Sequence, residues 1–496
     1  MPNGMKGLWL AAVLYGIGTA APVWAEEPQG PAKPSVTPVA GQAAPPAQGG
    51  MIRRGEEAIE STSLEDLLLE KGLITMDDWI RIKAEEERRT SERSIVAEFT
   101  GSARWYERIT MFGYGMFRYN PILSQNNPLT DYHDSSVGAN QGFFFRRIRW
   151  VVTGQVSDHV AFFIQPDLAS NVSGNIYTLS MRDAYGDFIF DKDKEFRLRV
   201  GLQRVPASFD NWQASRVRMA IDRADATNSG AQSERDTGLS FMWTSKIAQA
   251  RYKQMLDYMY GPGDYGTLGI WVYNGQGQTN AEANADKHVG IRASWPLELP
   301  GGRLMEVGMN AYRGMFNVNM GTRPAAGTTT TTLYSFNESS TSGVRSDSRN
   351  YLDERANFYV YLPPQPWGFI GEWVTGRGPE RNPQGIVVER ALQGGYGQLH
   401  YQWKYSNTGL ANLYSRYQYY NGGIKFLAGA PSDRGMQEVE AGIAWQPDPQ
   451  WEFTVAYAYM HRPNTSQTYA GTPTQPGGAF TADANLIRMQ MIWFWN

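Results

Sequence analysis

Arginine is the residue type in this chain whose spacing could act chemically on a solute. Seven arginines fall into three groups: Arg147 and Arg149; Arg197 and Arg199; and Arg216, Arg218 and Arg223. A guanidinium group stays charged at every physiological pH, and its planar fork matches the oxygens of phosphate and carboxylate. A row of such groups beside a water-filled path would raise the local concentration of anions. The pattern therefore predicts an electrostatic filter for anions.

A second interpretation is that these arginines brace the structure through ion pairs. Acidic residues that could pair with them are Asp210, Asp222, Asp225, Glu234, Glu306 and Glu372. Ion-pair networks can hold a loop against a wall, so both interpretations stand at this stage. The stretch 207–236, in which several of these residues lie, contains no lysine.

Other kinds of chemistry find little support in the residues. The G-x-G-x-x-G match at 261–266 contains a proline and is followed by an alternating segment rather than a helix, which indicates a turn and not a dinucleotide site. The five histidines lack the spacing of metal ligands, and no G-x-S-x-G nucleophile motif occurs. There is no cysteine for a disulfide or a thiol nucleophile. We therefore predict no enzyme, no cofactor and no metal.

The elements that must position the arginines have the pattern of β-strands. Apolar and polar residues alternate in 196–203, so that Arg197, Arg199 and Gln203 share one face. Segments of about ten residues with the same alternation recur from Ile109 to Trp495, which is the length that a tilted membrane strand needs. Their apolar faces suit lipid and their polar faces suit a water-filled interior. Beyond the N-terminus no apolar run approaches the roughly 20 residues of a membrane helix, so a spanning structure must be a closed barrel.

The predicted fold is therefore all-β: a transmembrane antiparallel β-barrel of about 16 strands, where the count of about seventeen candidate segments permits 18 equally. An even number follows if both ends of the barrel lie on the same side of the membrane. Short connections at 190–195 and 445–450 suit the inner side, whereas long polar segments suit the outer side. The long segments are 120–141, 317–350 and 463–483. We expect a further long segment, near 206–236, to fold inward as a constriction loop, because long loops in compact folds are usually functional.

The chain before the barrel divides into three parts by composition. Residues 1–25 have the charged start, apolar stretch and small final residue of a secretory signal peptide. Residues 26–62 are rich in Pro, Ala and Gly and predict an extended linker. Residues 63–104 predict a periplasmic helical segment, either a coiled coil or a small helical hairpin on the rim. The barrel is predicted to occupy residues 105–496.

Several motifs resemble a known family. The matching residues are Arg146–Arg149, Met181–Tyr185, Arg199–Phe209, Arg223–Ala224 and Arg235–Leu239. Together they resemble the core of the phosphate-selective porin O/P family, and the likeness covers most of the chain after about Trp105. The resemblance implies a trimeric porin of 16 strands in the outer membrane of a Gram-negative bacterium. Such a protein passes small hydrophilic solutes by passive diffusion, with a preference for anions such as phosphate.

Charge and composition limit the partners. The formal net charge of −3 argues against binding of nucleic acid, which calls for a basic surface. The expected partners are outer-membrane lipid, small anionic or neutral solutes, two further copies of the chain, and an envelope protein bound through residues 63–104. Two alternatives to a porin are a barrel that serves as a scaffold or sheath for an envelope complex, and a secreted glycan-binding β-protein.

Overall fold

The computed structural model describes residues 108–495 and, before them, residues 68, 71 and 73. The gaps within it are 128, 130–136, 138–141, 172–173, 231–234, 259, 279–281, 283, 319–334, 337–349, 382–385, 407–408, 424–432 and 465–479. The predicted signal peptide, the linker and nearly all of the helical segment 63–104 lie outside the described residues.

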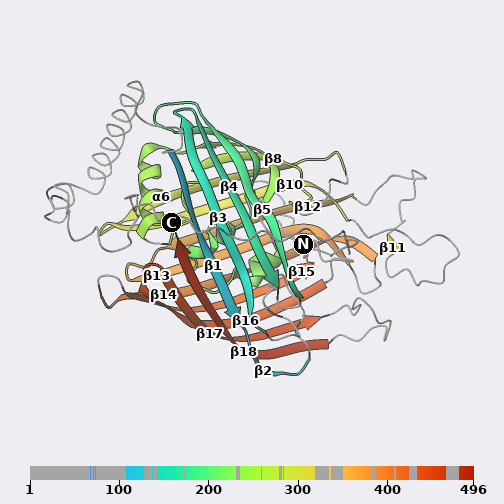
Figure 1. Ribbon diagram of the computed structural model, residues 1–496. Coiled ribbons are helices and arrows are strands. Elements are labelled where there is room, and N and C mark those ends of the chain that lie inside the picture. The colour runs from blue at the N-terminus through green and yellow to red at the C-terminus, as the bar shows by residue number, and fades with distance from the viewer. Residues whose placement is uncertain are drawn as a thin grey trace, which may run out of the picture.

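Sixteen long antiparallel strands make up the described part of the chain (Figure 1). They are β1 (Ile109–Tyr119), β3 (Phe144–Ser157), β4 (Val160–Asn171), β5 (Gly174–Ile189), β6 (Phe196–Arg204), β7 (Arg235–Trp243), β8 (Leu268–Tyr273), β9 (His288–Leu299), β10 (Arg303–Asn317), β12 (Asn350–Leu362), β13 (Trp367–Arg381), β14 (Ile386–Lys404), β15 (Leu410–Gly423), β16 (Asp433–Asp448), β17 (Trp451–Asn464) and β18 (Phe480–Trp495).

The sheet closes on itself because the first long strand pairs with the last. Gly113 of β1 lies opposite Trp495 of β18, and Tyr119 lies opposite Met489. Two short strands add to the ladder. β2 (Ile122–Gln125) continues the pairing of the first strand along β18 after Pro121, and β11 (Ser335–Phe336) lies parallel to β14. The predicted closed antiparallel barrel of 16 strands is thus confirmed.

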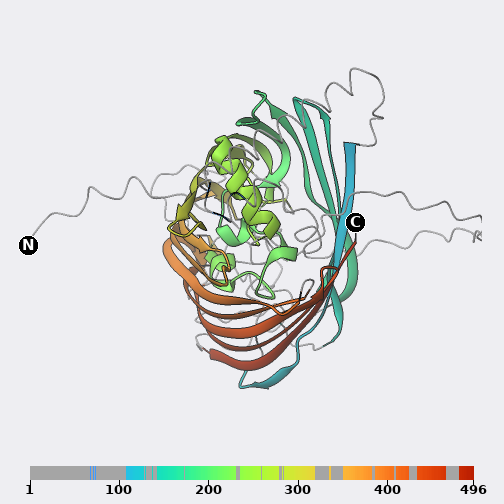
Figure 2. The same ribbon diagram turned by 90° about the vertical axis from the view of Figure 1, so that its left-hand side faces the viewer.

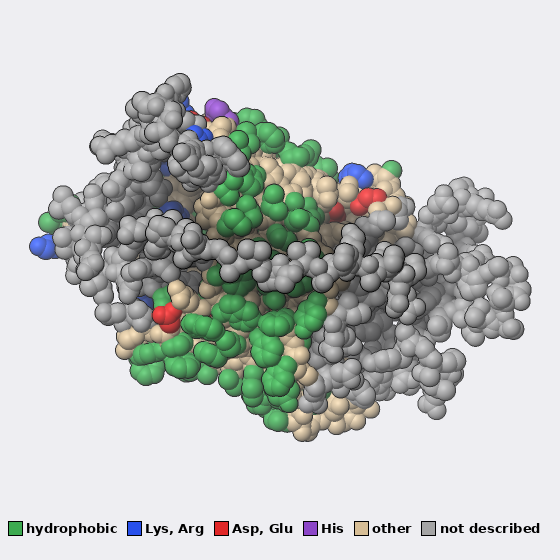
Figure 3. All heavy atoms as spheres, in the orientation of Figure 1, with side chains coloured by type: hydrophobic (Ala, Val, Ile, Leu, Met, Phe, Trp, Pro, Cys, Tyr) green, Lys and Arg blue, Asp and Glu red, His purple; other side chains and the backbone are tan. Residues whose placement is uncertain are grey.

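The outer face of the barrel is apolar, as the alternation predicts. In β17, Trp451, Val455 and Tyr457 are 41%, 47% and 44% exposed, whereas Glu452 and Thr454 between them are buried. An exposed Val beside a buried Glu is the reverse of a water-soluble sheet and is typical of a strand between lipid and a polar lumen. Figure 3 shows hydrophobic side chains across the middle of one face, with charged side chains toward its two ends.

Tryptophan side chains gather at one end of the strands. Trp367, Trp403, Trp445 and Trp451 lie at strand ends beside short turns, and all four are exposed on the outer face. Indole rings favour the level at which lipid tails meet head groups, so these residues form an aromatic girdle.

The connections differ in length at the two ends of the barrel. At one end, here called the short-turn end, they include 158–159, 190–195, 300–302 and 449–450. The turn predicted at 445–450 is shorter than expected because β16 continues to Asp448. At the opposite end the three long predicted segments lie largely outside the described residues. One connection at the short-turn end, 244–267, is long and contains helix α6 (Lys246–Tyr258).

Three short helices fill part of the interior. They are α4 (Phe209–Trp212), the 3-10 helix η2 (Ser215–Val217) and α5 (Asp225–Gly230), all in the connection between β6 and β7. Figure 2 shows them inside the ring of strands. Among the described residues, none of the helices combines the length and hydropathy that crossing a membrane requires.

Candidate functional site

The inner loop, defined here as residues 205–230, crosses the lumen and packs on the wall formed by β10 to β13. Phe209 is fully buried, with its ring centroid 4.7 Å from that of Tyr361 and 5.0 Å from that of Tyr359. The indole Nε1 of Trp212, also fully buried, donates a hydrogen bond of 3.1 Å to Asn310 Oδ1. Burial of two large aromatic side chains contributes several kcal/mol, on the order of 2–3 kcal/mol each, to holding the loop in place.

The start of α4 is fixed by two capping groups. Ser208 is its N-cap, and its Oγ accepts a hydrogen bond of 3.0 Å from the amide of Asn211. From the wall, the Glu372 carboxylate accepts hydrogen bonds from the amides of Phe209 at 2.9 Å and Asp210 at 3.3 Å. The free amides at a helix start need such acceptors, so the wall orients this end of the loop.

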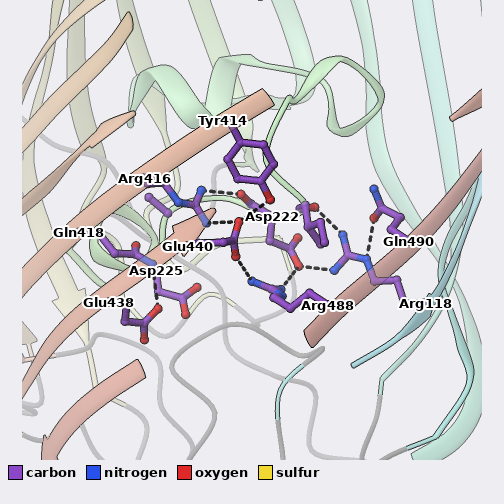
Figure 4. Close-up of polar contacts among 12 residues, drawn as sticks. Arg118, Asp222, Asp225, Tyr414, Arg416, Gln418, Glu438, Glu440, Arg488 and Gln490 are labelled. Atoms are coloured by element: carbon purple, nitrogen blue, oxygen red, sulfur yellow. Dashed lines mark hydrogen bonds and ion pairs between the residues drawn. The ribbon is translucent and has the colours of Figure 1, made fainter. Parts of the chain in front are cut away.

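The far end of the loop is held by a charged group that we call the tip network (Figure 4). Its members are Arg118, Asp222, Asp225, Arg416, Glu438, Glu440, Arg462 and Arg488. Asp222 pairs with Arg118 and, at 3.1 Å, with Arg488. Asp225 pairs with Arg462 at 2.6 Å. The loop therefore contributes two carboxylates to a wall that is rich in arginine.

The tip network keeps Asp222 ionised. Burial raises the pKa of this carboxyl, but the charges of Arg118, Arg146 and Arg488 outweigh burial and hold the pKa well below its ordinary value. The attachment of the loop tip is therefore an ionic one at neutral pH.

Four of the seven predicted filter arginines pair with carboxylates. Arg149 pairs with Asp167 at 2.8 Å, and Arg218 pairs with Asp210 at 3.3 Å. The Nε and Nη2 of Arg199 donate hydrogen bonds of 2.7 and 2.8 Å to the two oxygens of Asp187. Arg197 pairs with Asp264 at 2.8 Å. These contacts support the bracing interpretation for these four residues.

The other three predicted arginines are Arg147 on the wall and Arg216 and Arg223 on the loop. Arg147 is only 5% exposed on the wall, and among the described residues it forms no ion pair; its Nε and Nη1 have no hydrogen-bond partner. Arg216 and Arg223 on the loop keep partial exposure, and the Cζ of Arg216 lies 5.5 Å from the ring centroid of Phe112 on β1.

Two partly exposed arginines at β-bulges, Arg146 and Arg182, were not predicted as filter residues. Between β1 and β3, Met116 lies opposite Arg147 and Phe117 opposite Phe145, so Arg146 is an extra residue in a β-bulge. Between β4 and β5, Gln165 lies opposite Asp183 and Pro166 opposite Met181, so Arg182 is the extra residue. A bulge re-aims a side chain, and a strict two-residue period misses it. Pro166, which cannot donate to the ladder, was the available signal for the second bulge.

A second segment enters the barrel from the short-turn end. We call residues 244–267 the turn insertion. Its Tyr260 is buried, and the Tyr260 carbonyl accepts a hydrogen bond of 2.9 Å from Gln213 of the inner loop. The ring centroid of Tyr265 lies 4.6 Å from that of Trp212. The Gly261–Gly266 stretch read as a turn lies in this insertion and is followed by strand β8.

Among the described residues, no three His, Asp or Glu side chains are grouped so that they could hold a metal ion. The chemistry that the interior offers is thus that of fixed charges: paired arginines that hold the loop, and a smaller set beside the remaining solvent.

Comparison with known proteins gives one family and several solved barrels. The model of the family "Phosphate-selective porin O and P" matches residues 129–494. No curated protein sequence matches the chain. Similar structures include OmpT of Vibrio cholerae in its trimer form, with 10% identity and a TM-score of 0.45, where 78% of this chain and 99% of that chain are covered. They also include the channel DcaP of Acinetobacter baumannii, with 12% identity, a TM-score of 0.44 and coverage of 78% and 97%.

An anion-selective porin from Comamonas acidovorans is also similar, with 10% identity, a TM-score of 0.43 and coverage of 78% and 99%. The family model spans well over half of the sequence, and the closed barrel with an apolar outer face agrees with it. The chain therefore belongs to the phosphate-selective porin O and P family and is a porin of the Gram-negative outer membrane.

Proposed function

We propose that this porin passes small anions in preference to cations, and that its filter consists of the lumen arginines Arg146, Arg147, Arg182, Arg216 and Arg223. Four of them, all but Arg147, keep partial exposure inside the barrel, where most other charged side chains are buried. A permeating anion meets the four arginines that water reaches, and it is also attracted by the buried charge of Arg147 beside them. Small neutral solutes would pass as well, without the electrostatic gain.

The single observation that carries the proposal is the arginine pair at the bulge of β3. Arg146 and Arg149 both repel the charge of Arg147, and Asp167 and Asp222 attract it from a distance, but none of the described carboxylates forms an ion pair with Arg147. Two adjacent guanidinium groups repel each other, and an anion that passes between wall and loop relieves that repulsion. Oxyanions such as phosphate should be attracted more strongly than chloride, because their oxygens match the guanidinium fork.

The braced arginines have a different part in this proposal. Arg149, Arg199 and Arg218 already give their charge to Asp167, Asp187 and Asp210. Their contribution is to hold the loop and wall in register, so that the inner loop narrows the lumen opposite β3.

The test is a reversal-potential measurement in planar bilayers with a KCl gradient. We expect the unmodified porin to favour chloride over potassium. The double variant Arg146→Gln/Arg147→Gln should lower the chloride-to-potassium permeability ratio roughly fourfold or more. This is the effect of removing a charge about 5 Å from the path in a water-like medium. The matched control is Arg313→Gln, since that side chain is 66% exposed on the outer face. Potassium selectivity in the unmodified porin, or an unchanged ratio in the double variant, would overturn the proposal.

Assembly belongs to the proposal as well. We propose that three copies form the functional unit and that residues 63–104 contact an envelope protein. Cross-linking of the detergent-purified protein should give a trimeric band, and a stoichiometric envelope protein should co-purify with the full chain but not with a chain that lacks 63–104.

A further inference from the structure

The turn insertion packs against the inside of the barrel wall. On α6, Ala248, Tyr252 and Met255 are fully buried. The Tyr252 hydroxyl and the Ser294 hydroxyl of β9 are hydrogen-bonded at 2.7 Å, and Arg251 pairs with Glu298 at 2.8 Å. These contacts fix the helix against the wall at the short-turn end, which is the periplasmic end because outer-membrane barrels have short periplasmic turns.

The chain after α6 runs into the lumen. The hydroxyl of Tyr260 accepts a hydrogen bond of 2.9 Å from Asn412 of β15, so this residue reaches a strand well away from β8. It packs in the same apolar cluster as Phe209 of the inner loop and Tyr396 of β14. The turn insertion therefore meets the inner loop from the opposite direction, and both occupy the lumen.

The insertion also brings in a carboxylate. Asp264 Oδ1 lies 2.8 Å from Arg197 Nη2 and accepts hydrogen bonds from the Thr244 hydroxyl at 2.8 Å and the Gly266 amide at 2.9 Å. The side chains of Arg197 and Asp264 remain 14% and 22% exposed. Arg197 is the second residue of β6, close to the 190–195 turn, so the pair lies near the periplasmic mouth.

We propose that Asp264 is a specificity-determining residue of this porin: it cancels the charge of Arg197 at the periplasmic mouth and so limits the preference for anions set at the lumen arginines. The inference rests on the proposed anion preference. An anion that leaves the filter next meets a neutral pair instead of a second cation. Weak binding at the exit speeds release, which conduction requires as much as it requires attraction at the entrance.

The test is Asp264→Asn in the full-length porin. The amide oxygen can keep the hydrogen bonds from Thr244 and Gly266, so the insertion keeps its geometry while Arg197 loses its counter-charge. In 0.1 M KCl we expect the chloride-to-potassium permeability ratio to rise about threefold, the effect of one uncovered charge near the path at this ionic strength. The double variant Arg197→Gln/Asp264→Asn should return the ratio to that of the unmodified porin.

The matched control is Asp193→Asn, because Asp193 is also periplasmic and paired, with Lys246 at 2.9 Å, but its side chain is 39% exposed on the rim. This control should leave the ratio unchanged. An unchanged ratio in Asp264→Asn, or a conductance rise that is equal for both ions, would overturn the inference. Its failure is distinguishable from that of the proposed function: the selectivity of the unmodified porin tests the filter, whereas the shift on substitution tests Asp264.

Discussion

Replacement of Asp222 by Asn should release the tip of the inner loop while the barrel stays intact. The Asp222 carboxylate lies between Arg118 and Arg488, and the three side chains are 7%, 1% and 2% exposed. Breaking a buried ion pair by removing one partner typically costs about 3–5 kcal/mol, because the remaining charge is left without compensation. The barrel itself depends on its ladder of backbone hydrogen bonds, which this change does not touch.

The cost of Asp222→Asn should lie near the lower end of the range of about 3–5 kcal/mol, because both arginines keep another partner. Arg488 keeps its ion pair with Glu440 at 2.8 Å, and Arg118 keeps its hydrogen bond to Gln490 at 2.7 Å. A cost of about 3 kcal/mol corresponds to a rise of roughly a hundredfold in the detached fraction of the loop tip.

Hydrogen exchange measures the detached fraction of the loop tip directly. The amides of residues 218–230 should exchange faster in Asp222→Asn by about the same factor, whereas the strand amides should be unchanged, and single-channel recordings should show added current noise. Asp286→Asn, at an exposed position between β8 and β9, is the control. Equal exchange at 218–230 in both variants would refute the assignment of Asp222 as an attachment point of the loop tip.

Two further predictions concern pH and lipid. Arginine charges hold the pKa of Asp222 well below its ordinary value of about 3.9, so the stabilisation of the loop tip by Asp222 is complete above that value and is lost as pH falls through the lower folded-state pKa. Channel noise should therefore be constant from about pH 8 to 5 and rise only below about pH 4. A rise near pH 6 would contradict the ionic attachment. Val455 is 47% exposed on the lipid face, so Val455→Arg should destabilise the barrel by about 2–4 kcal/mol in urea unfolding from lipid vesicles. The control Val455→Leu should leave the free energy of unfolding unchanged. Equal stability of the two variants would contradict the assignment of that face to lipid.

The barrel could be predicted from sequence because its two environments are so unlike. In β17, β16 and β18 each residue faces either lipid or the lumen, and the two-residue period records that choice directly. The repeat of this pattern permitted 16 or 18 strands, and the resemblance to the porin O/P family favoured 16. The turn at 445–450 was placed correctly but made too long, since an apolar-polar period does not mark where hydrogen bonding ends.

The pairing of the arginines could not be predicted in the same way. Arg462 and its partner Asp225 are 237 positions apart in the chain, so their contact depends on how the whole cylinder closes. Arg146 and Arg182 were missed because each lies in a bulge, where the two-residue period fails.

Helix α6 was missed although the sequence held a signal. Ala248, Tyr252 and Met255 recur at the spacing of one helical face, and all three are buried. Between two strands of a barrel, a period of 3.6 residues over so short a stretch does not by itself distinguish a helix from a plain connection.

The position of Asp222 has a consequence for how the porin matures. Its two arginine partners come from β1 and β18, the strands whose pairing makes the seam of the cylinder. In a chain whose seam is still open, Asp222 cannot contact both arginines at once, although Asp225 can still pair with Arg462 of β17. The loop tip therefore gains its full set of ion pairs only when the barrel closes, so the last step of barrel closure also completes the attachment of the loop.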